Sequence, residues 1–269
     1  MLSYPNIDPV IFSLGPLQVR WYGLMYILGF AAAYMLVKYQ AGLFQWKQLL
    51  KHVDNLNLAL IAGVILGGRL GYVLFYNLSY YLQHPLEIFA TWQGGMSFHG
   101  GCIGVLVCGA LFSKRHAIDF WQGADLYVVT VPIGLGLGRI GNFMNGELYG
   151  RITEVPWGMI FPSGGPWPRH PSQLYEVLLE GVFLFIILWS LKARPWQEEH
   201  KRCWPHGTML ALFLTLYGIF RFMVEFVREP DPQLGRVLAG MTMGQLLSMA
   251  MVISGILLWV WRRKAADAS

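Results

Sequence analysis

The sequence changes character at Gly138-Arg139-Ile140-Gly141-Asn142-Phe143-Met144-Asn145-Gly146-Glu147-Leu148-Tyr149-Gly150-Arg151. Residues 127–137, directly before it, are apolar enough to lie in lipid. The stretch itself holds two arginines, two asparagines and a glutamate among four glycines. Such groups are costly at the end of a membrane segment unless a polar ligand or partner meets them. Because arginine suits planar phosphate recognition, we expect the ligand to be the phosphate of a lipid.

The composition supports a membrane protein. The 269 residues are 55% hydrophobic and only 13% charged, whereas soluble domains carry about 25% charged residues. The net charge of +5 comes from short basic clusters between apolar runs, which is a topology pattern and argues against a nucleic-acid partner. Cys102, Cys108 and Cys203 have neither disulfide nor metal spacing. We therefore expect no metal and no cofactor.

The apolar segments predict an all-α polytopic membrane protein with seven transmembrane helices. A span needs ~20 mostly apolar residues. Segments that meet this requirement lie near 20–39, 54–76, 96–113, 120–139, 172–191, 207–227 and 241–261. The first basic residue is Arg20, so we expect no cleavable signal peptide and a retained first span. We predict one domain over residues 1–269.

Two connecting segments are more than turns. Residues 77–95, with Tyr80, Tyr81 and Trp92, predict an amphipathic arm at the membrane interface. Residues 140–171 are rich in Gly, Pro and Trp, so we expect an irregular cap outside the membrane with some β structure. Within the second span, glycines 63, 67 and 71 recur every four residues and predict close helix packing. Residues 136–141 match a dinucleotide-binding fingerprint, but they end a membrane segment and do not join a strand to a helix, so we reject that interpretation.

The basic residues predict the orientation. One alternate set of connections holds every lysine, in clusters at 38–51, 114–115, 192–202 and 262–264, and the other set holds only arginines. The lysine-bearing set should be cytoplasmic. We therefore expect the N-terminus outside, the C-terminus inside, and the polar groups of six spans at one level in the outer leaflet. These groups are Tyr22, Arg69, His99, Arg139, Glu176 and Arg221.

Several of these residues also have a purely structural interpretation. Arg221 and Glu225 stand four residues apart and can neutralise each other on one helix face. Arg69 can extend to the interface, while Tyr22 and Tyr72 suit an interfacial aromatic belt.

Further polar residues are open to two interpretations. His99, between Phe98 and two glycines, is either a general base or a structural histidine. His170, in the loop before the fifth span, is another histidine on the expected outer side. For Asp125 we favour an interaction with its own helix dipole. Glu180 could be a buried partner for an arginine, and Cys102 we interpret as a packing residue.

With these residues identified, the chain resembles the bacterial prolipoprotein diacylglyceryl transferase family over essentially its whole length. Residues 138–151 match the family signature at nearly every position. Further matching motifs are Trp21-Tyr22-Gly23-Leu24-Met25-Tyr26, Met96-Ser97-Phe98-His99-Gly100-Gly101, Arg169-His170-Pro171-Ser172-Gln173-Leu174-Tyr175-Glu176 and Arg221-Phe222-Met223-Val224-Glu225-Phe226. The resemblance implies a seven-span inner-membrane enzyme. Such an enzyme moves the diacylglyceryl group of phosphatidylglycerol to the lipobox cysteine of a prolipoprotein signal peptide and leaves glycerol 1-phosphate.

The residues and the resemblance together give a set of candidate site residues. The expected catalytic residues are His99, Arg139 and Arg221. The expected substrate-binding residues are Tyr22, Arg69, Tyr72, Asn142, Glu147 and Glu225. The reacting thiol belongs to the substrate, so the chain needs no reactive cysteine. Besides its two substrates we expect only membrane lipids as partners, and a monomer suffices.

Two other classes of protein share part of the pattern. A small transporter or lipid flippase also has intramembrane arginines and helices interrupted by glycine, but its polar groups should lie near the bilayer midplane. A receptor-like binding protein would not need three arginines at one depth. The expected common depth at one membrane face favours the transferase.

Overall fold

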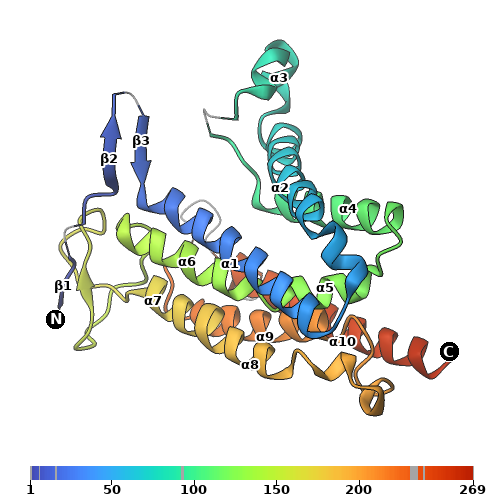
Figure 1. Cartoon of the computed structure of the whole chain (residues 1–269). Coiled ribbons are helices and arrows are strands. Elements are labelled where there is room, and N and C mark those ends of the chain that lie inside the picture. Colours follow the sequence, from blue (N-terminus) through green and yellow to red (C-terminus); the bar gives the residue numbers. More distant parts are fainter. Residues whose placement is uncertain are drawn as a thin grey trace. The chain divides into compact units, whose positions relative to one another are not determined.

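The computed structural model describes residues 2–5, 7–15, 17–91, 94–230, 236–238 and 240–268. Trp92 of the expected interfacial arm lies outside the described residues. The longer helices are α1 (Trp21–Leu43), α2 (Lys47–Tyr76), α4 (Phe98–Arg115), α5 (Phe120–Val128), α6 (Val131–Met144), α8 (Leu184–Leu191), α9 (Thr208–Val224) and α10 (Met243–Asp267) (Figure 1). Shorter helical segments are α3 (Leu78–Gln83), η1 (Pro85–Phe89), α7 (Ser172–Glu176), the π-helical η3 (Val177–Phe183), η4 (Arg194–Trp196) and η5 (Glu198–His200).

The β structure consists of three short two-stranded sheets. Strand β1 (Leu2–Ser3) pairs in parallel with β4 (Met159–Ile160). The antiparallel pairs are β2 (Val10–Leu14) with β3 (Leu17–Arg20), and β5 (Arg236–Leu238) with β6 (Met241–Thr242). Strand β4 and the bridges between residue 169 and residues 152 and 159 lie in or next to the expected cap, which confirms some β structure there.

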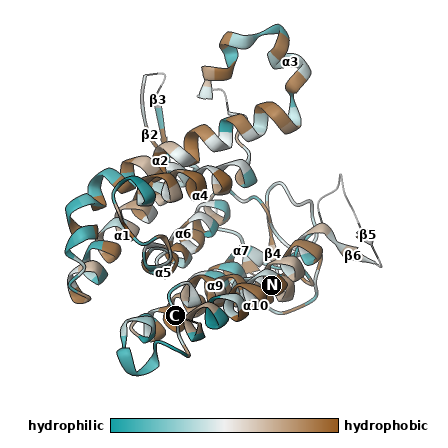
Figure 2. Cartoon of the chain, turned by 90° about the vertical axis from the view of Figure 1, so that its right-hand side faces the viewer, coloured by the Kyte–Doolittle hydropathy of each residue, from teal (hydrophilic) through white to brown (hydrophobic). Residues whose placement is uncertain are grey.

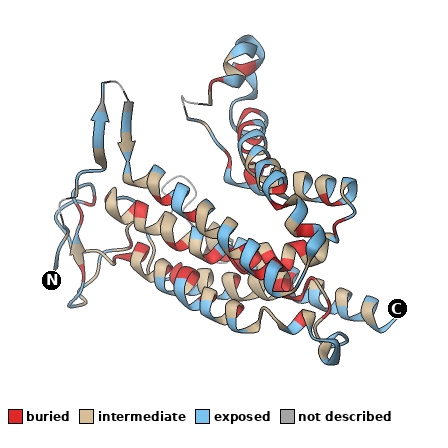
Figure 3. Cartoon of the chain, viewed as in Figure 1, coloured by how far each residue is buried: buried red, intermediate tan, exposed pale blue. Residues whose placement is uncertain are grey.

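The helices confirm an all-helical membrane protein, while the count of seven spans remains a prediction. Among the described residues, five helical segments are long and apolar enough to cross a membrane: Trp21–Leu43, Lys47–Tyr76, Phe120–Met144, Ser172–Trp196 and Met243–Asp267. Thr208–Val224 is a shorter apolar helix. Brown, hydrophobic residues recur along the helices in Figure 2. Pale blue, exposed residues recur along helices in Figure 3. Exposed apolar residues such as Ile103, Leu106 and Leu111 of α4 are the pattern expected of a surface that faces lipid.

The boundary of the fourth expected span was wrong in one respect. The span is divided into α5 and α6, because Pro132 lies in the first turn of α6 and Thr130 bonds back to the Tyr127 carbonyl with 2.7 Å between oxygens. Helix α6 then continues to Met144 and not to 139. Residues 140–144, expected in the irregular cap, are therefore helical, and Arg139 and Asn142 lie one turn apart on α6.

The described chain forms two compact units, Met1–Val37 with Ala124–Ser269, and Lys38–Gly123. In the second unit, α2 packs on α4 through glycines. A Cβ added at Gly63 would lie 2.7 Å from the Gly104 carbonyl oxygen, and one at Gly71 would lie 2.8 Å from the Gly100 Cα. Close backbone approach therefore requires these glycines, which confirms the packing role expected for the 63–67–71 spacing.

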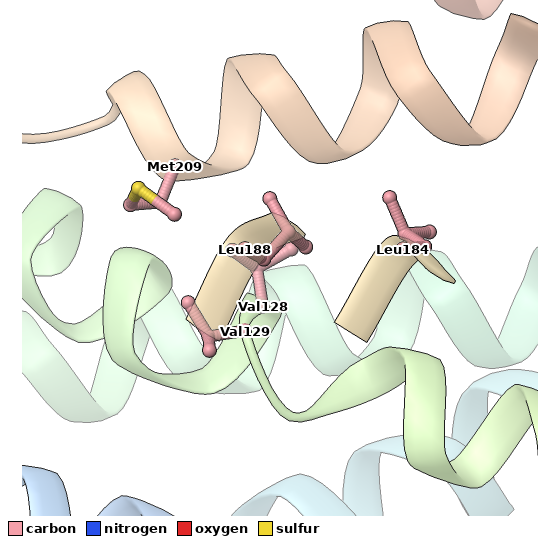
Figure 4. Close-up of a cluster of buried hydrophobic side chains, with 5 residues drawn as sticks. All are labelled: Val128, Val129, Leu184, Leu188 and Met209. Carbon is pink, nitrogen blue, oxygen red and sulfur yellow. The ribbon is translucent and has the colours of Figure 1, made fainter. Parts of the chain in front are cut away.

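The first unit has an apolar core at one end and a capped helix beside it. Val128 and Val129 pack with Leu184, Leu188 and Met209, which come from α8 and α9 (Figure 4). Nearby, the buried Asp125 carboxylate accepts hydrogen bonds from the main-chain nitrogens of residues 207, 209 and 210, at 2.8, 3.0 and 3.2 Å. The interaction expected between Asp125 and its own helix was therefore wrong, because this carboxylate caps the start of α9.

The glycine contact gives a stability prediction. The variant Gly104→Ala should lower the unfolding temperature of the purified protein in detergent, because the new Cβ would overlap the Gly63 carbonyl. Overpacking of this kind costs about 1–3 kcal/mol. The matched control is Gly101→Ala on the same helix, whose Cβ would lie 3.6 Å from the Val64 carbonyl oxygen, an ordinary contact. Equal unfolding temperatures for the two variants would contradict the prediction.

Candidate active site

The candidate site is built around the carboxylate of Glu176 in the first unit. Glu176 belongs to α7 and is fully buried. Its Oε2 atom lies 2.6 Å from Nε of Arg139 on α6 and 3.0 Å from Nη1 of Arg221 on α9. One buried carboxylate therefore brings together arginines that stand 82 positions apart along the chain. A charge in this environment is tolerated only when it is paired.

A second carboxylate extends this arrangement. Glu225 follows α9 and pairs with Nη2 of Arg221, and its Oε1 atom lies 3.3 Å from Nη1 of Arg228. The hydroxyl of Thr242 donates to its other oxygen at 2.8 Å. The expected pairing of Arg221 with Glu225 is thus present, but it is one part of a larger network and does not neutralise Arg221 alone.

A third carboxylate completes the group. Glu180, in the π-helical segment η3, is fully buried, and its Oε1 atom lies 3.8 Å from Nη1 of Arg221. Neither of its oxygens accepts a hydrogen bond from the described residues. We call these three arginines and three glutamates the ion cluster: Arg139, Arg221, Arg228, Glu176, Glu180 and Glu225. Their formal charges balance.

The turn after α6 places two further candidates beside the cluster. Gly146 adopts a φ of 63°, in the left-handed region, and the chain folds back so that the Glu147 nitrogen donates to the Asn142 carbonyl at 3.1 Å. The Asn142 amide in turn donates to Glu147 Oε1 at 2.9 Å. Nη1 of Arg139 donates to Asn142 Oδ1 at 3.5 Å. Asn142 and Glu147 therefore join the arginine through one chain of polar contacts.

Tyr22 lies against the same helix. It stands in the first turn of α1, and a Cβ added at Gly141 would lie 2.9 Å from its ring, so the glycine allows the ring to approach α6. Its hydroxyl lies 3.1 Å from that of Tyr26. Six of the nine expected site residues therefore share the first unit: Tyr22, Arg139, Asn142, Glu147, Arg221 and Glu225.

The other three expected site residues belong to the second unit, Lys38–Gly123. Arg69 is buried, and its guanidinium donates to the main-chain carbonyls of residues 87, 88 and 94 at 2.6, 2.7 and 2.7 Å. It also lies over the ring of Tyr81, 5.1 Å from the centroid. Arg69 therefore fixes the described part of the expected interfacial arm. Tyr72 packs on Tyr76 with 5.6 Å between ring centroids, and His99 is exposed in the first turn of α4.

Two histidines in the expected outer region differ in their surroundings. His170 Nδ1 lies 3.1 Å from the hydroxyl of Tyr175, which accepts a bond from Trp157 at 2.7 Å. Partial burial lowers the pKa of His170, so its neutral form is favoured. His99 has no such bonding partner among the described residues and is the freer of the two for proton transfer.

Sequence reasoning left two of the three glutamates of the ion cluster, and one of its arginines, without an assigned role. The sequence placed Glu176 at the same expected membrane level as the other polar groups but gave it no role. It suggested Glu180 only as a buried partner for an unnamed arginine, and it gave Arg228 no role. One signal was present, because Glu176 and Glu180, and likewise Glu225 and Arg228, stand three or four residues apart near the ends of apolar segments. Among the described residues, no group of three His, Cys, Asp or Glu residues could hold a metal ion.

Known proteins match the chain over almost its full length. A family model described as "Prolipoprotein diacylglyceryl transferase" matches residues 9–261. A protein of Desulfotalea psychrophila is 66% identical over 260 residues, covering 97% of this chain and 95% of its own length. Relatives from Geobacter sulfurreducens and Pseudomonas aeruginosa (strain LESB58) are 54% and 52% identical, over 95% and 99% of this chain and 95% and 98% of their own lengths. All three are named phosphatidylglycerol–prolipoprotein diacylglyceryl transferase. The chain belongs to the prolipoprotein diacylglyceryl transferase family.

Proposed function

We propose that the chain transfers the sn-1,2-diacylglyceryl group of phosphatidylglycerol to the lipobox cysteine thiol of a prolipoprotein and releases glycerol 1-phosphate. Family membership over residues 9–261 supports the activity. The observation that carries the assignment to a site is the convergence of Arg139 and Arg221 on the buried Glu176 carboxylate. This reaction would be the first step in the maturation of a bacterial lipoprotein.

The chemistry requires two kinds of protein group. The substrate thiol loses its proton and attacks the glyceryl carbon next to the phosphate, the carbon–oxygen bond breaks, and its electron pair remains on the departing phosphate. Positioned guanidinium groups stabilise that charge, which is often the largest single contribution to catalysis. Arg139 is the more accessible of the two arginines, with 21% of its side chain exposed against 11% for Arg221.

Glu176 acts on these arginines as a positioning residue. Arg139 is bound to Glu176 through Nε and to Asn142 through Nη1, so its guanidinium has a defined orientation with Nη2 still available. Tyr22, Glu147 and Glu225 would complete the binding site around the headgroup. In the second unit, Arg69 and Tyr72 would contribute to substrate binding through the arm that they hold.

The general base in this proposal is His99. Its ring is exposed at the start of α4, while the following Gly100 and Gly101 are buried. Histidine is the side chain that most often acts as a general base near neutral pH, so it suits removal of the thiol proton. The proposed arrangement in the bilayer has seven spans, the N-terminus in the periplasm, and the site at the periplasmic leaflet of a monomer.

Loss of the Arg139 guanidinium should slow the reaction strongly. We expect purified wild type in detergent to release glycerol phosphate from phosphatidylglycerol only when the lipobox peptide contains its cysteine. The Arg139→Gln variant should lose ~10²–10³-fold in rate, as when a charge-stabilising group is removed. Release of glycerol phosphate in the presence of a peptide with serine in place of the cysteine would reject the transferase function. So would the absence of release by folded wild type.

The base hypothesis predicts a different defect. His99→Gln should lower the turnover number by ~10²–10⁴-fold, the usual contribution of a general base, while the KM for phosphatidylglycerol stays near that of wild type. The control is His170→Gln, whose rate should change little because its ring is bound to Tyr175. Near-wild-type turnover of His99→Gln would remove the base role and leave positioning by the arginines.

The central carboxylate gives a third prediction. Glu176→Gln should lower the turnover number about 10²-fold, because a misaligned catalytic group costs roughly that much. It should also lower the unfolding temperature, since breaking a buried ion pair costs about 3–5 kcal/mol. The control is Glu198→Gln, which removes an ion pair to Lys201 whose partners are 61% and 91% exposed; such pairs contribute about 0–1 kcal/mol. Equal turnover in the two variants would reject the positioning role of Glu176.

A further inference from the structure

A cavity of about 270 Å³ lies beside the ion cluster. Phe222 and Phe226 of the α9 end form part of its wall, and Thr242 and Gln245 at the start of α10 form another part, together with Arg151. All of these residues belong to the first unit. Cavities that hold drug-sized ligands begin at about 300 Å³, so this one suits a smaller group such as a polar headgroup.

The cavity and the ion cluster share a boundary. The Thr242 hydroxyl, which lines the cavity, donates to Glu225 Oε2 at 2.8 Å. Arg151 donates from Nε to the Arg228 carbonyl at 2.9 Å and from Nη2 to the Glu225 carbonyl at 3.4 Å. A ligand in the cavity would therefore lie next to the Arg221–Glu225 pair.

Arg151 differs from the arginines of the ion cluster in having no carboxylate partner among the described residues. Arg139, Arg221 and Arg228 all pair with carboxylates, and Arg169 pairs with Glu229 at 2.9 Å. In the part of the chain that the structure describes, Arg151 forms no ion pair, and its hydrogen bonds go only to main-chain carbonyls. Two of its five N–H donors are used in this way, which leaves Nη1 and an uncompensated positive charge at the cavity.

Gln245 adds a second donor at the same cavity. It is buried, and its side-chain oxygen accepts a bond from the Thr242 nitrogen at 3.0 Å in a helix-capping box. Its amide NH₂ group has no hydrogen-bond partner among the described residues. A guanidinium and an amide donor beside two phenyl rings form a site for an anion, and the apolar walls strengthen the attraction by lowering the local dielectric constant.

We infer that this cavity receives the phosphate and glycerol of the departing headgroup, with Arg151 as its phosphate-binding residue. This inference rests on the proposed function. When the thiolate attacks, the phosphate diester, which carries one negative charge, becomes a monoester with a charge of about −1.5 to −2 near pH 7. Each arginine of the ion cluster is already paired with a carboxylate, so the added charge needs another cation. Arg151 supplies it at the edge of the cluster, where it bonds to the main-chain carbonyls of Glu225 and Arg228.

The test measures binding of sn-glycerol 1-phosphate by equilibrium dialysis with the full chain in detergent. Arg151→Gln should raise the Kd about 10- to 100-fold, the usual effect of losing a charged hydrogen bond. Phe222→Trp should also weaken binding, because the larger ring would fill part of the cavity while Arg151 is kept. The matched control is Met223→Trp at the next position, which is 54% exposed and does not line the cavity. It should bind as wild type does.

The outcomes separate this inference from the proposed function. Wild-type affinity in both Arg151→Gln and Phe222→Trp would overturn the inference, even if the enzyme turns over phosphatidylglycerol. Equal weakening in Met223→Trp and Phe222→Trp would overturn it as well. Conversely, wild type that binds glycerol phosphate through Arg151 but transfers no lipid would support the anion site and reject the transferase function.

Discussion

The first unit depends on one buried carboxylate shared by two arginines. Glu176 holds Arg139 of α6 and Arg221 of α9 at 2.6 and 3.0 Å from a single oxygen. In surroundings with little water, removing Glu176 would leave Arg139 without its carboxylate partner, and a buried ion pair that loses one partner costs several kcal/mol. The same contacts therefore set how α6, α7 and α9 pack and how the arginines are oriented. Stability and chemistry are coupled here, because the groups that would meet the phosphate are also those that hold the helices.

A charge-balanced cluster has a consequence for catalysis. Arginines that are fully paired provide directed N–H groups but little net positive potential, so they favour a ligand through geometry more than through charge. The proposed reaction increases the negative charge of the phosphate at the moment of bond cleavage. A site that is neutral at rest and has an unpaired arginine at its edge would favour the product-like state over the bound lipid. That is the difference between ground state and transition state on which catalysis depends.

The sequence predicted the helices better than the contacts between them. Helix-long apolar runs and the 63–67–71 glycine spacing depend on local patterns, and each expected run lies mainly in helices of the structure. Arg139 and Arg221 could be selected because arginine is rare at that depth. Glu176 could not be paired with Arg139 or Arg221, because ion pairing depends on which helices meet, and residues 37 and 45 positions apart carry no local signal of contact. Asp125 was misjudged for the same reason, since the helix that it caps begins 83 positions later.

Arg69 shows the limit of an argument from depth alone. It stands at the expected level, like Arg139, but its guanidinium is occupied by carbonyls of residues 87, 88, 94 and 95. An arginine saturated by main-chain oxygens has its donors committed to the fold. Arg139 instead shares its donors between a carboxylate and an amide and stays one-fifth exposed, with 21% of its side chain accessible. A structural arginine and a proposed phosphate-binding arginine therefore differ in how many N–H groups remain after the hydrogen bonds of the fold are made. That number depends on tertiary contacts.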